Sequence, residues 1–364
     1  MSLRPRPEIE NLKACPHGGL NYAELEASGL TSEAVLDFSV CTNPFPPPPQ
    51  VRKMLHTAAI GQYPDSETTE IRGRLSERLA VPRDNIIVGS GTTELIRLIA
   101  LAYFQPGDRI LLFQPTYGEY EMASLITSAE PVKQKLKAED NFTPRLAETI
   151  ELIRRHHPRA AFICNPNNPT GRYLSRQEVE TVRDALGDDL LIIDEAYVNF
   201  TLGSWSSIDL ISTSNVVILR SMTKDYALAG LRLGYAITRR EIIHSLRQVC
   251  PPWNVNVMAQ KMGAAVLSEA DYLEQSQQKI SRAKEFLVGE LSQLGYQILP
   301  SEAHFFLVRV GNAREFRTAL LKHGILVRDC ASFGLPEYIR LAPRTMPECR
   351  KFITAIVRVL SQIK

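Results

Sequence analysis

The stretches LLIIDEAY (190–197) and VVILRSMTK (216–224) are apolar runs that each end in charged or hydroxyl-bearing residues. Three similar apolar runs precede them, at 86–88, 110–113 and 160–164. All five runs are continuously apolar rather than alternating, which is typical of strands covered on both faces. Because stretches of helical periodicity separate them, the sequence predicts an α/β fold whose mainly parallel sheet is sandwiched by helices.

A change in the pattern of helices and strands near residue 254 predicts a domain boundary there. Helices are expected at 92–104, 117–128, 144–156 and 175–185. Beyond 254, helices at 270–294, 313–323 and 347–363 and strands at 304–310, 325–328 and 338–341 predict a smaller α+β domain. We therefore expect an N-terminal arm (1–45) packed on the small domain, a large domain (46–253) and a small C-terminal domain (254–364).

Composition excludes several classes of protein. The 364 residues include 42 Lys and Arg against 40 Asp and Glu, a net charge of +2, which argues against a nucleic-acid or anionic-membrane partner. No apolar run approaches the roughly 18 residues of a spanning helix, and no secretory signal is visible. The six cysteines are scattered without a CxxC pattern, so we expect reduced thiols and a cytoplasmic protein.

Polar motifs follow the strands at the sheet edge where open parallel sheets bind ligands. GSGTTE (89–94) opens a helix and suits either an anion site or a tight turn. NPNNPTG (165–171) suits either a plain turn or amides that face a ligand. A buried Asp194 carboxylate needs a cation or strong hydrogen-bond donors, which a ligand could supply. A helix cap or an internal ion pair within the protein is the structural alternative.

Lys224 would be a solvated surface group if it stood alone. Arg232, within GLRLG (230–234), follows it in the chain. A nearby cation together with desolvation would lower the pKa of the Lys224 amine, as an amine nucleophile requires. A nicotinamide-dependent dehydrogenase is disfavoured, because Glu94 stands where the third glycine of the dinucleotide fingerprint belongs.

This set of motifs resembles the class I/II aminotransferase family, pyridoxal-phosphate enzymes with the aspartate-aminotransferase fold. The resemblance covers residues 17–340 and is strongest in NPTG (168–171), DEAY (194–197), SMTK (221–224) and GLRLG (230–234). It implies pyridoxal 5'-phosphate as the cofactor, bound by the large domain. It also implies a homodimer, in which Tyr63 of QYPD (62–65) reaches the cofactor phosphate from the partner subunit.

The resemblance also implies roles for single residues. Lys224 would hold the cofactor aldehyde covalently and then act as acid and base at the substrate Cα, while Asp194 would keep the ring nitrogen protonated. Asn168 and Tyr197 would donate to the 3-oxygen of the ring, and Tyr117 would stack on its face. The cofactor phosphate would be held by Gly91, Thr92, Thr93, Ser221, Thr223 and Arg232.

Substrate contacts are implied in the same way. Arg340 would bind the substrate carboxylate with help from Asn168, and Arg328 would bind a phosphate in relatives with phosphorylated substrates. His17 and Gly18, in the HGG motif (17–19), resemble the arm that grips the substrate phosphate in threonine-phosphate decarboxylase. In contrast, PTYGEY (115–120) resembles histidinol-phosphate aminotransferase. Cys41 replaces an asparagine that both relatives usually carry, which predicts a changed contact with the substrate carboxylate.

Either of two reactions fits these residues, because Lys224, Asp194 and Arg340 would serve both. The bond held perpendicular to the cofactor ring is the one that breaks, so a rotation about one bond separates decarboxylation from transamination. We predict decarboxylation of L-threonine O-3-phosphate, in cobalamin synthesis, with transamination of histidinol phosphate to 2-oxoglutarate as the alternative. A relative that binds without turnover is a third possibility. No metal site is predicted, since His156 and His157 are expected at a solvated helix end.

Overall fold

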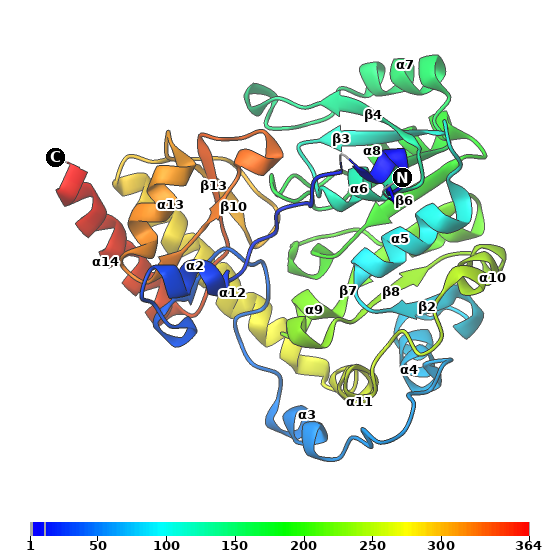
Figure 1. Ribbon diagram of the computed structural model, residues 1–364, viewed down its shortest axis with the longest axis horizontal. Helices are drawn as coiled ribbons and strands as arrows, with labels where there is room; N and C mark the ends of the chain where they lie inside the picture. Colours follow the sequence, from blue (N-terminus) through cyan, green and yellow to red (C-terminus); the bar gives the residue numbers. More distant parts are fainter. Residues whose placement is uncertain (1–2, 11, 364) are drawn as a thin grey trace.

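A seven-stranded sheet forms the centre of the large domain in the computed structural model, which describes residues 3–10 and 12–363 (Figure 1). The strand order is β2-β8-β7-β6-β5-β3-β4. β3 to β7 run parallel, and β8 pairs antiparallel with both of its neighbours. The strands are β2 (Ile86–Gly89), β3 (Arg109–Gln114), β4 (Glu130–Lys135), β5 (Ala160–Cys164), β6 (Leu190–Asp194), β7 (Val216–Ser221) and β8 (Gly234–Ile237).

Helices cover both faces of this sheet, which confirms the sandwich expected from the continuously apolar runs. Consecutive residues of β6 face opposite cores, with Ile193 in one and Ile192 in the other. The first core also contains side chains of α4 (Thr69–Leu79), α7 (Leu146–His156), α8 (Arg176–Leu186) and α11 (Val257–Val266). The second contains side chains of α5 (Thr92–Tyr103), α6 (Glu119–Ile126) and α10 (Arg240–Val249). Each face of the central strands is therefore covered by a hydrophobic core.

The small domain contains a four-stranded antiparallel sheet of order β12-β13-β10-β9. Its strands are β9 (Gln297–Ile298), β10 (Phe306–Arg309), β12 (Arg328–Asp329) and β13 (Tyr338–Leu341). Helices α12 (Ala270–Gln293), α13 (Ala313–Leu321) and α14 (Met346–Ile363) belong to the same part of the chain. α12 and α14 pack against each other and share a core with Phe306 and Ile339.

The N-terminal arm contacts both domains. It contains α1 (Pro7–Glu10), α2 (Tyr22–Ala27) and β1 (Leu36–Asp37), and β1 pairs in parallel with β11 (Ile325–Leu326) of the small domain. Glu24 of α2 also accepts two hydrogen bonds of 2.6 Å from Arg317. α1 lies beside α6 of the large domain, so the chain between α1 and α2 crosses from one domain to the other (Figure 1).

Several elements differ from the sequence-based expectations. β4 and β8 were not predicted: β4 (EPVKQK) is a partly exposed edge strand with few apolar residues, and β8 (GYAI) contains no continuous run of branched apolar residues. The predicted strand at 325–328 is divided between two sheets as β11 and β12. The division at residue 254 stays a proposal. α11, just beyond it, packs on α4 of the large domain.

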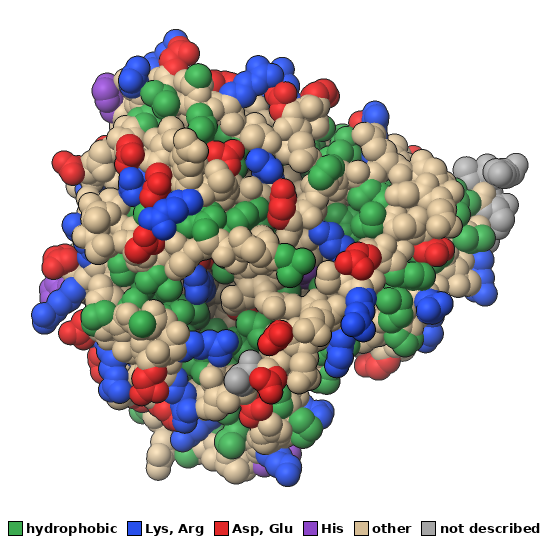
Figure 2. Space-filling model, turned by 180° about the vertical axis from the view of Figure 1, so that it is seen from behind, with side chains coloured by type: hydrophobic (Ala, Val, Ile, Leu, Met, Phe, Trp, Pro, Cys, Tyr) green, Lys and Arg blue, Asp and Glu red, His purple; other side chains and the backbone are tan. Residues whose placement is uncertain are grey.

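The charged surface residues and the cysteines are arranged as the composition led us to expect. Acidic and basic side chains are interspersed over the face drawn in Figure 2 rather than gathered into one patch of a single sign. All six cysteines are free thiols. Within the described residues, no helix combines the length and the apolar content that crossing a bilayer requires.

Candidate active site

The predicted site residues meet in one cavity of about 780 Å³, at the carboxyl ends of the parallel strands. Both domains and the N-terminal arm line it. The predicted residues that line it are His17, Gly18, Cys41, Thr92, Thr93, Tyr117, Asn168, Asp194, Tyr197, Ser221, Thr223, Lys224, Arg232, Arg328 and Arg340. Gly91 caps the adjoining helix α5. Tyr63 lies outside the cavity, on the surface.

Asp194 ends β6 and is buried in the cavity wall. The Tyr120 hydroxyl donates to its Oδ2 at 2.7 Å, and the Ala196 N–H donates to its Oδ1 at 3.0 Å. Burial raises the pKa of the Asp194 carboxyl to about 6, because these two donors offset only part of the lost hydration. A cationic N–H donor placed in the cavity would therefore bind this carboxylate strongly.

Lys224 lies in the short helix α9 (Met222–Asp225), directly after β7. Burial lowers the pKa of its amine, and the nearby cations Arg340 and Arg232 lower it further. No carboxylate among the described residues forms an ion pair with it, and its Nζ lies 6.0 Å from the centre of the Tyr197 ring. This shift favours the uncharged, nucleophilic form of the amine.

A cradle for an anion lies at the start of α5. Gly91 caps this helix without a side-chain hydrogen bond, which leaves the N–H groups of its first turn free. A Cβ at Gly91 would lie 2.9 Å from Arg232 Nη2, so glycine lets the guanidinium approach the helix end. The Ser221 and Thr223 hydroxyls are 2.6 Å apart at the same place. Arg232 pairs with no carboxylate in the described part of the chain, so a phosphate would supply its missing partner.

Tyr117 completes the site. Its hydroxyl lies 3.0 Å from Thr93 Oγ1, which fixes the ring above the end of the sheet. The features now described are a buried acceptor, a half-buried amine, an aromatic face and an anion cradle. These residues fit pyridoxal 5'-phosphate, which, when bound, supplies an electron sink for the bonds at a substrate Cα.

Comparison with known proteins agrees with this geometry. A family model described as "Aminotransferase class I and II" matches residues 33–356. The chain belongs to this family. It is 32% identical to the histidinol-phosphate aminotransferase of Symbiobacterium thermophilum over 325 residues, which cover 88% of this chain and 89% of the relative. It is 36% identical to histidinol-phosphate aminotransferase 1 of Carboxydothermus hydrogenoformans, over 82% of this chain and 84% of the relative.

Solved structures give the same picture. The histidinol-phosphate aminotransferase from Clostridium acetobutylicum superimposes with a TM-score of 0.82 at 28% identity, over 90% of this chain and 100% of that one. The L-threonine-O-3-phosphate decarboxylase from Porphyromonas gingivalis does so with a TM-score of 0.79 at 26% identity, over 89% and 99%. The Thermus thermophilus aspartate aminotransferase, at 20% identity and a TM-score of 0.79 over 93% and 94%, shows the shared fold alone. The predicted family, fold and cofactor are confirmed, and this class I/II aminotransferase is a pyridoxal-phosphate enzyme.

On the substrate side of this aminotransferase-family site, the two arginines form hydrogen bonds within the protein. Arg340 donates to Asn168 Oδ1 and, at 2.6 Å, to the Ser39 carbonyl, so Asn168 orients Arg340. Arg328 donates to the Pro16 carbonyl at 2.8 Å and to Ser332 Oγ at 2.7 Å. Both arginines thus donate hydrogen bonds to neutral oxygen atoms of the protein. A substrate anion would compete with these acceptors or add to them.

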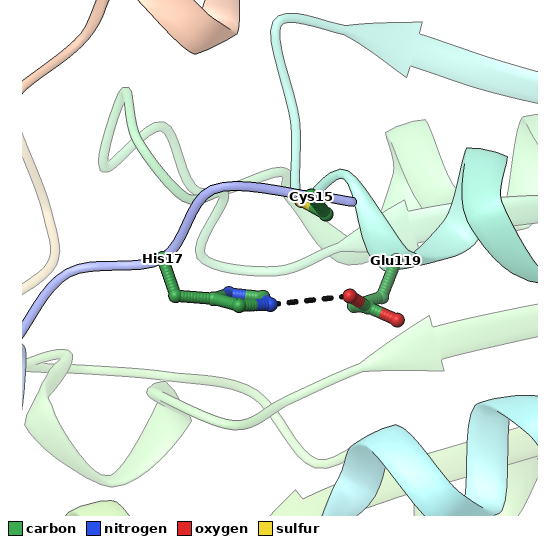
Figure 3. A group of neighbouring side chains, drawn as sticks. All are labelled: Cys15, His17 and Glu119. Carbon is green, nitrogen blue, oxygen red and sulfur yellow. Dashed lines mark hydrogen bonds and ion pairs between the residues drawn. The ribbon is translucent and has the colours of Figure 1, made fainter. Parts of the chain in front are cut away.

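The arm residue His17 reaches across the cavity to the start of α6. Its Nε2 lies 3.1 Å from Glu119 Oε1 (Figure 3). Arg97 donates to Glu119 Oε2 at 2.7 Å. The sequence did not reveal Glu119 or Arg97 as partners of the arm. His17 and Glu119 are separated by 102 residues in the chain, so no local sequence motif could indicate their contact.

Cys41 is almost fully buried in the cavity wall, beside Tyr197 and Ala342. Burial raises the pKa of its thiol, although Arg340 and Lys224 act in the opposite direction. The thiol is therefore a neutral, apolar wall of the site. That character agrees with the expectation that an amide contact to substrate is absent here.

The hydrogen bond from Tyr120 to Asp194 was not predicted from the sequence. We expect it to affect how activity depends on pH. Asp194 must be ionised to accept from the protonated ring nitrogen, so activity falls at a pH low enough to protonate this carboxyl in the holoenzyme. Tyr120→Phe removes a donor that stabilises the ionised form, which raises the pKa of Asp194. The acid limb of kcat/KM should move to higher pH by about one pH unit.

Tyr173→Phe is the matched control, because the Tyr173 hydroxyl accepts from the Trp205 N–H, away from Asp194. Its pH profile should match that of the unmodified enzyme. An unchanged acid limb in Tyr120→Phe would contradict the role of Tyr120.

Proposed function

We propose that the enzyme transfers the amino group of a small phosphorylated amine, of which histidinol phosphate is the first candidate, to 2-oxoglutarate. The sequence motifs ranked threonine-phosphate decarboxylation first. Relatives named histidinol-phosphate aminotransferase, 30–36% identical to this chain, favour the alternative. The decarboxylase neighbour, at 26% identity, supports the first reading less strongly.

One observation carries the substrate class. Arg328 of β12 and Arg340 of β13 are directly opposite each other in an antiparallel pair, and both line the cavity. Like charges in this position repel, and burial together with Arg340 lowers the pKa of Arg328. No carboxylate among the described residues forms an ion pair with either guanidinium. An anionic substrate relieves this repulsion, since a phosphate or carboxylate can accept from both forks at once.

The residues that line the cavity have separate roles in the proposed reaction. The guanidinium pair binds the anionic end of the substrate and sets its orientation. Lys224 then moves a proton at the substrate Cα, for which an amine of lowered pKa is suited near neutral pH. Asp194 keeps the opposite end of the site negatively charged. Two alternating substrates fit the same residues, because the phosphate of one and a carboxylate of 2-oxoglutarate are both anionic groups that guanidinium forks accept.

Decarboxylation of threonine phosphate is the second candidate, and the arm favours it. His17 and Gly18 line the cavity beside Arg328, where a third contact to a substrate phosphate would lie. A Cβ at Gly18 would lie 2.6 Å from the Ser39 carbonyl, so this glycine is needed for the arm to lie there. The arm geometry is compatible with a phosphate grip of the kind that the HGG motif predicts.

A product assay separates the two reactions. The holoenzyme is incubated with histidinol phosphate or threonine phosphate, with and without 2-oxoglutarate, and glutamate and carbon dioxide are measured. We expect glutamate from histidinol phosphate only when 2-oxoglutarate is present, and no carbon dioxide from either compound. Carbon dioxide from threonine phosphate, without glutamate, would overturn transamination in favour of the second candidate.

Arg328→Gln is the variant that tests the anion site in the same assay. It removes one of the two forks and should raise KM for the phosphorylated substrate by about tenfold or more, since a charge-assisted hydrogen bond contributes about 1.5–3 kcal/mol. Arg309→Gln, on the same sheet but paired with Glu337 at the surface, is the control and should leave KM unchanged.

We also propose a homodimer in which Tyr63 acts in the site of the partner subunit. Tyr63 is 78% exposed and stacks on Trp253, itself 46% exposed, with ring centres 4.2 Å apart. Ile60, 80% exposed, adds to this apolar surface. A pair of large aromatic rings in water is unusual for a free surface and suits an interface between two copies.

Mixed dimers test this arrangement. Lys224→Ala and Tyr63→Ala should each lose most activity alone. When the two are mixed and exchange subunits, one site of each mixed dimer keeps both native residues if Tyr63 acts across the interface. Activity should therefore return on mixing. No recovery, with sedimentation showing that mixed dimers form, would mean that Tyr63 does not act across the interface.

A further inference from the structure

Three potential metal ligands converge where the N-terminal arm meets helix α6. Cys15 and His17 come from the arm, and Glu119 is the first residue of α6 (Figure 3). One ligand atom of each residue lies within 4.8 Å of the other two. We name these residues the Cys15–His17–Glu119 cluster. The sequence predicted no metal site, and Glu119 lies 102 residues from His17 in the chain, so no motif joins the three residues.

The donor set matches the chemistry of zinc. Thiolate sulfur, imidazole nitrogen and carboxylate oxygen are the three ligand types that Zn²⁺ takes in proteins. His17 Nε2 and Glu119 Oε1 are 3.1 Å apart, close to the roughly 3.3 Å that separates two ligands held about 2.0–2.1 Å from a tetrahedral ion. Three protein ligands leave a fourth position for water or another group.

The surroundings hold two of the ligands in place. Arg97 binds Glu119 Oε2, which leaves Oε1 directed at His17. Outer hydrogen bonds of this kind orient a metal-binding carboxylate. A Cβ at Gly118 would lie 2.5 Å from the Cys15 sulfur, so the glycine gives the thiol its space beside α6.

We propose that the Cys15–His17–Glu119 cluster binds one Zn²⁺ ion and that the ion fastens the arm over the active-site cavity. On binding, the Cys15 thiol gives up its proton to solvent and its sulfur binds the metal. The His17 and Glu119 contact with each other is replaced by one bond from each to the ion. Nothing is oxidised or reduced.

Fastening the arm has a consequence for the substrate, which rests on the proposed function. Pro16 lies between two of the ligands in the chain, and its carbonyl accepts from Arg328. An arm fixed by the metal keeps this hydrogen bond in place, so Arg328 is less free to bind the substrate anion. Zn²⁺ therefore raises KM for a phosphorylated substrate and leaves kcat unchanged.

The direct test uses Co²⁺ as a visible stand-in for Zn²⁺. The holoenzyme is titrated with Co²⁺, and the ligand-field absorption is read at the red end of the visible spectrum, away from the cofactor. We expect one equivalent to give an intense, tetrahedral-type signal that Zn²⁺ abolishes. This readout needs no turnover, so it stands whether or not the proposed reaction is correct.

Variants assign the signal to the cluster. Cys15→Ser and His17→Gln should each lower metal affinity by more than the 10–100-fold typical of outer-shell changes. Cys250→Ser is the control, because Cys250 is also a partly exposed free thiol but lies outside the cluster. Absence of a one-to-one signal, or a signal lost equally in Cys250→Ser, would overturn the metal site.

Kinetics then test the fastened arm. KM for the phosphorylated substrate that the product assay identifies is measured with and without one equivalent of Zn²⁺, in the unmodified enzyme and in Cys15→Ser. The proposal expects the rise in KM only where Cys15 is present. Stoichiometric binding without any change in KM would overturn the fastened arm, and an equal effect in Cys15→Ser would place the inhibiting ion elsewhere.

Discussion

Burial of Lys224 and Asp194 at the ends of neighbouring strands is the constraint on which the rest of the site depends. Both line the same cavity, Asp194 buried and Lys224 half-buried, yet no ion pair joins them, and desolvation shifts the pKa of each toward its neutral form. Two opposite charges that lose hydration without contacting each other are destabilising. Pyridoxal 5'-phosphate would meet both needs, because it offers a reactive aldehyde for the amine and a basic ring nitrogen for the carboxylate.

The sheet makes this arrangement possible. β6 and β7 are adjacent and parallel, with Asp194 opposite Leu219, so their polar endings reach the same edge. The small domain adds the guanidinium pair from Arg328 and Arg340, and the arm adds Cys15 and His17. The residues proposed to react therefore lie on the large domain, whereas the guanidinium pair proposed to bind the substrate comes from the small domain.

The sequence predicted most of the reactive centre and less of what surrounds it. Buried strands such as β6 stand out because both faces are apolar, and the polar residues that follow them mark the ligand edge. The edge strand β4 carries little apolar signal, and the short strands β11 and β12 belong to sheets that only tertiary packing defines. Contacts such as Tyr120 with Asp194 join residues far apart in the chain, so periodicity could not reveal them. The prediction of a decarboxylase depended on the HGG motif of the arm. This motif bears on phosphate binding and does not determine which bond at the substrate Cα breaks.

Chemical trapping of the holoenzyme tests the central claim most directly. Borohydride reduces a covalent link between a lysine and the cofactor aldehyde, and the modified peptide can then be identified by mass. The account predicts that the reduced cofactor adds its mass to the peptide that carries Lys224 and to no other. Lys284 is a useful comparison, because burial also lowers the pKa of its amine although it lies outside the cavity. Added mass on Lys284, or none on Lys224, would contradict the account.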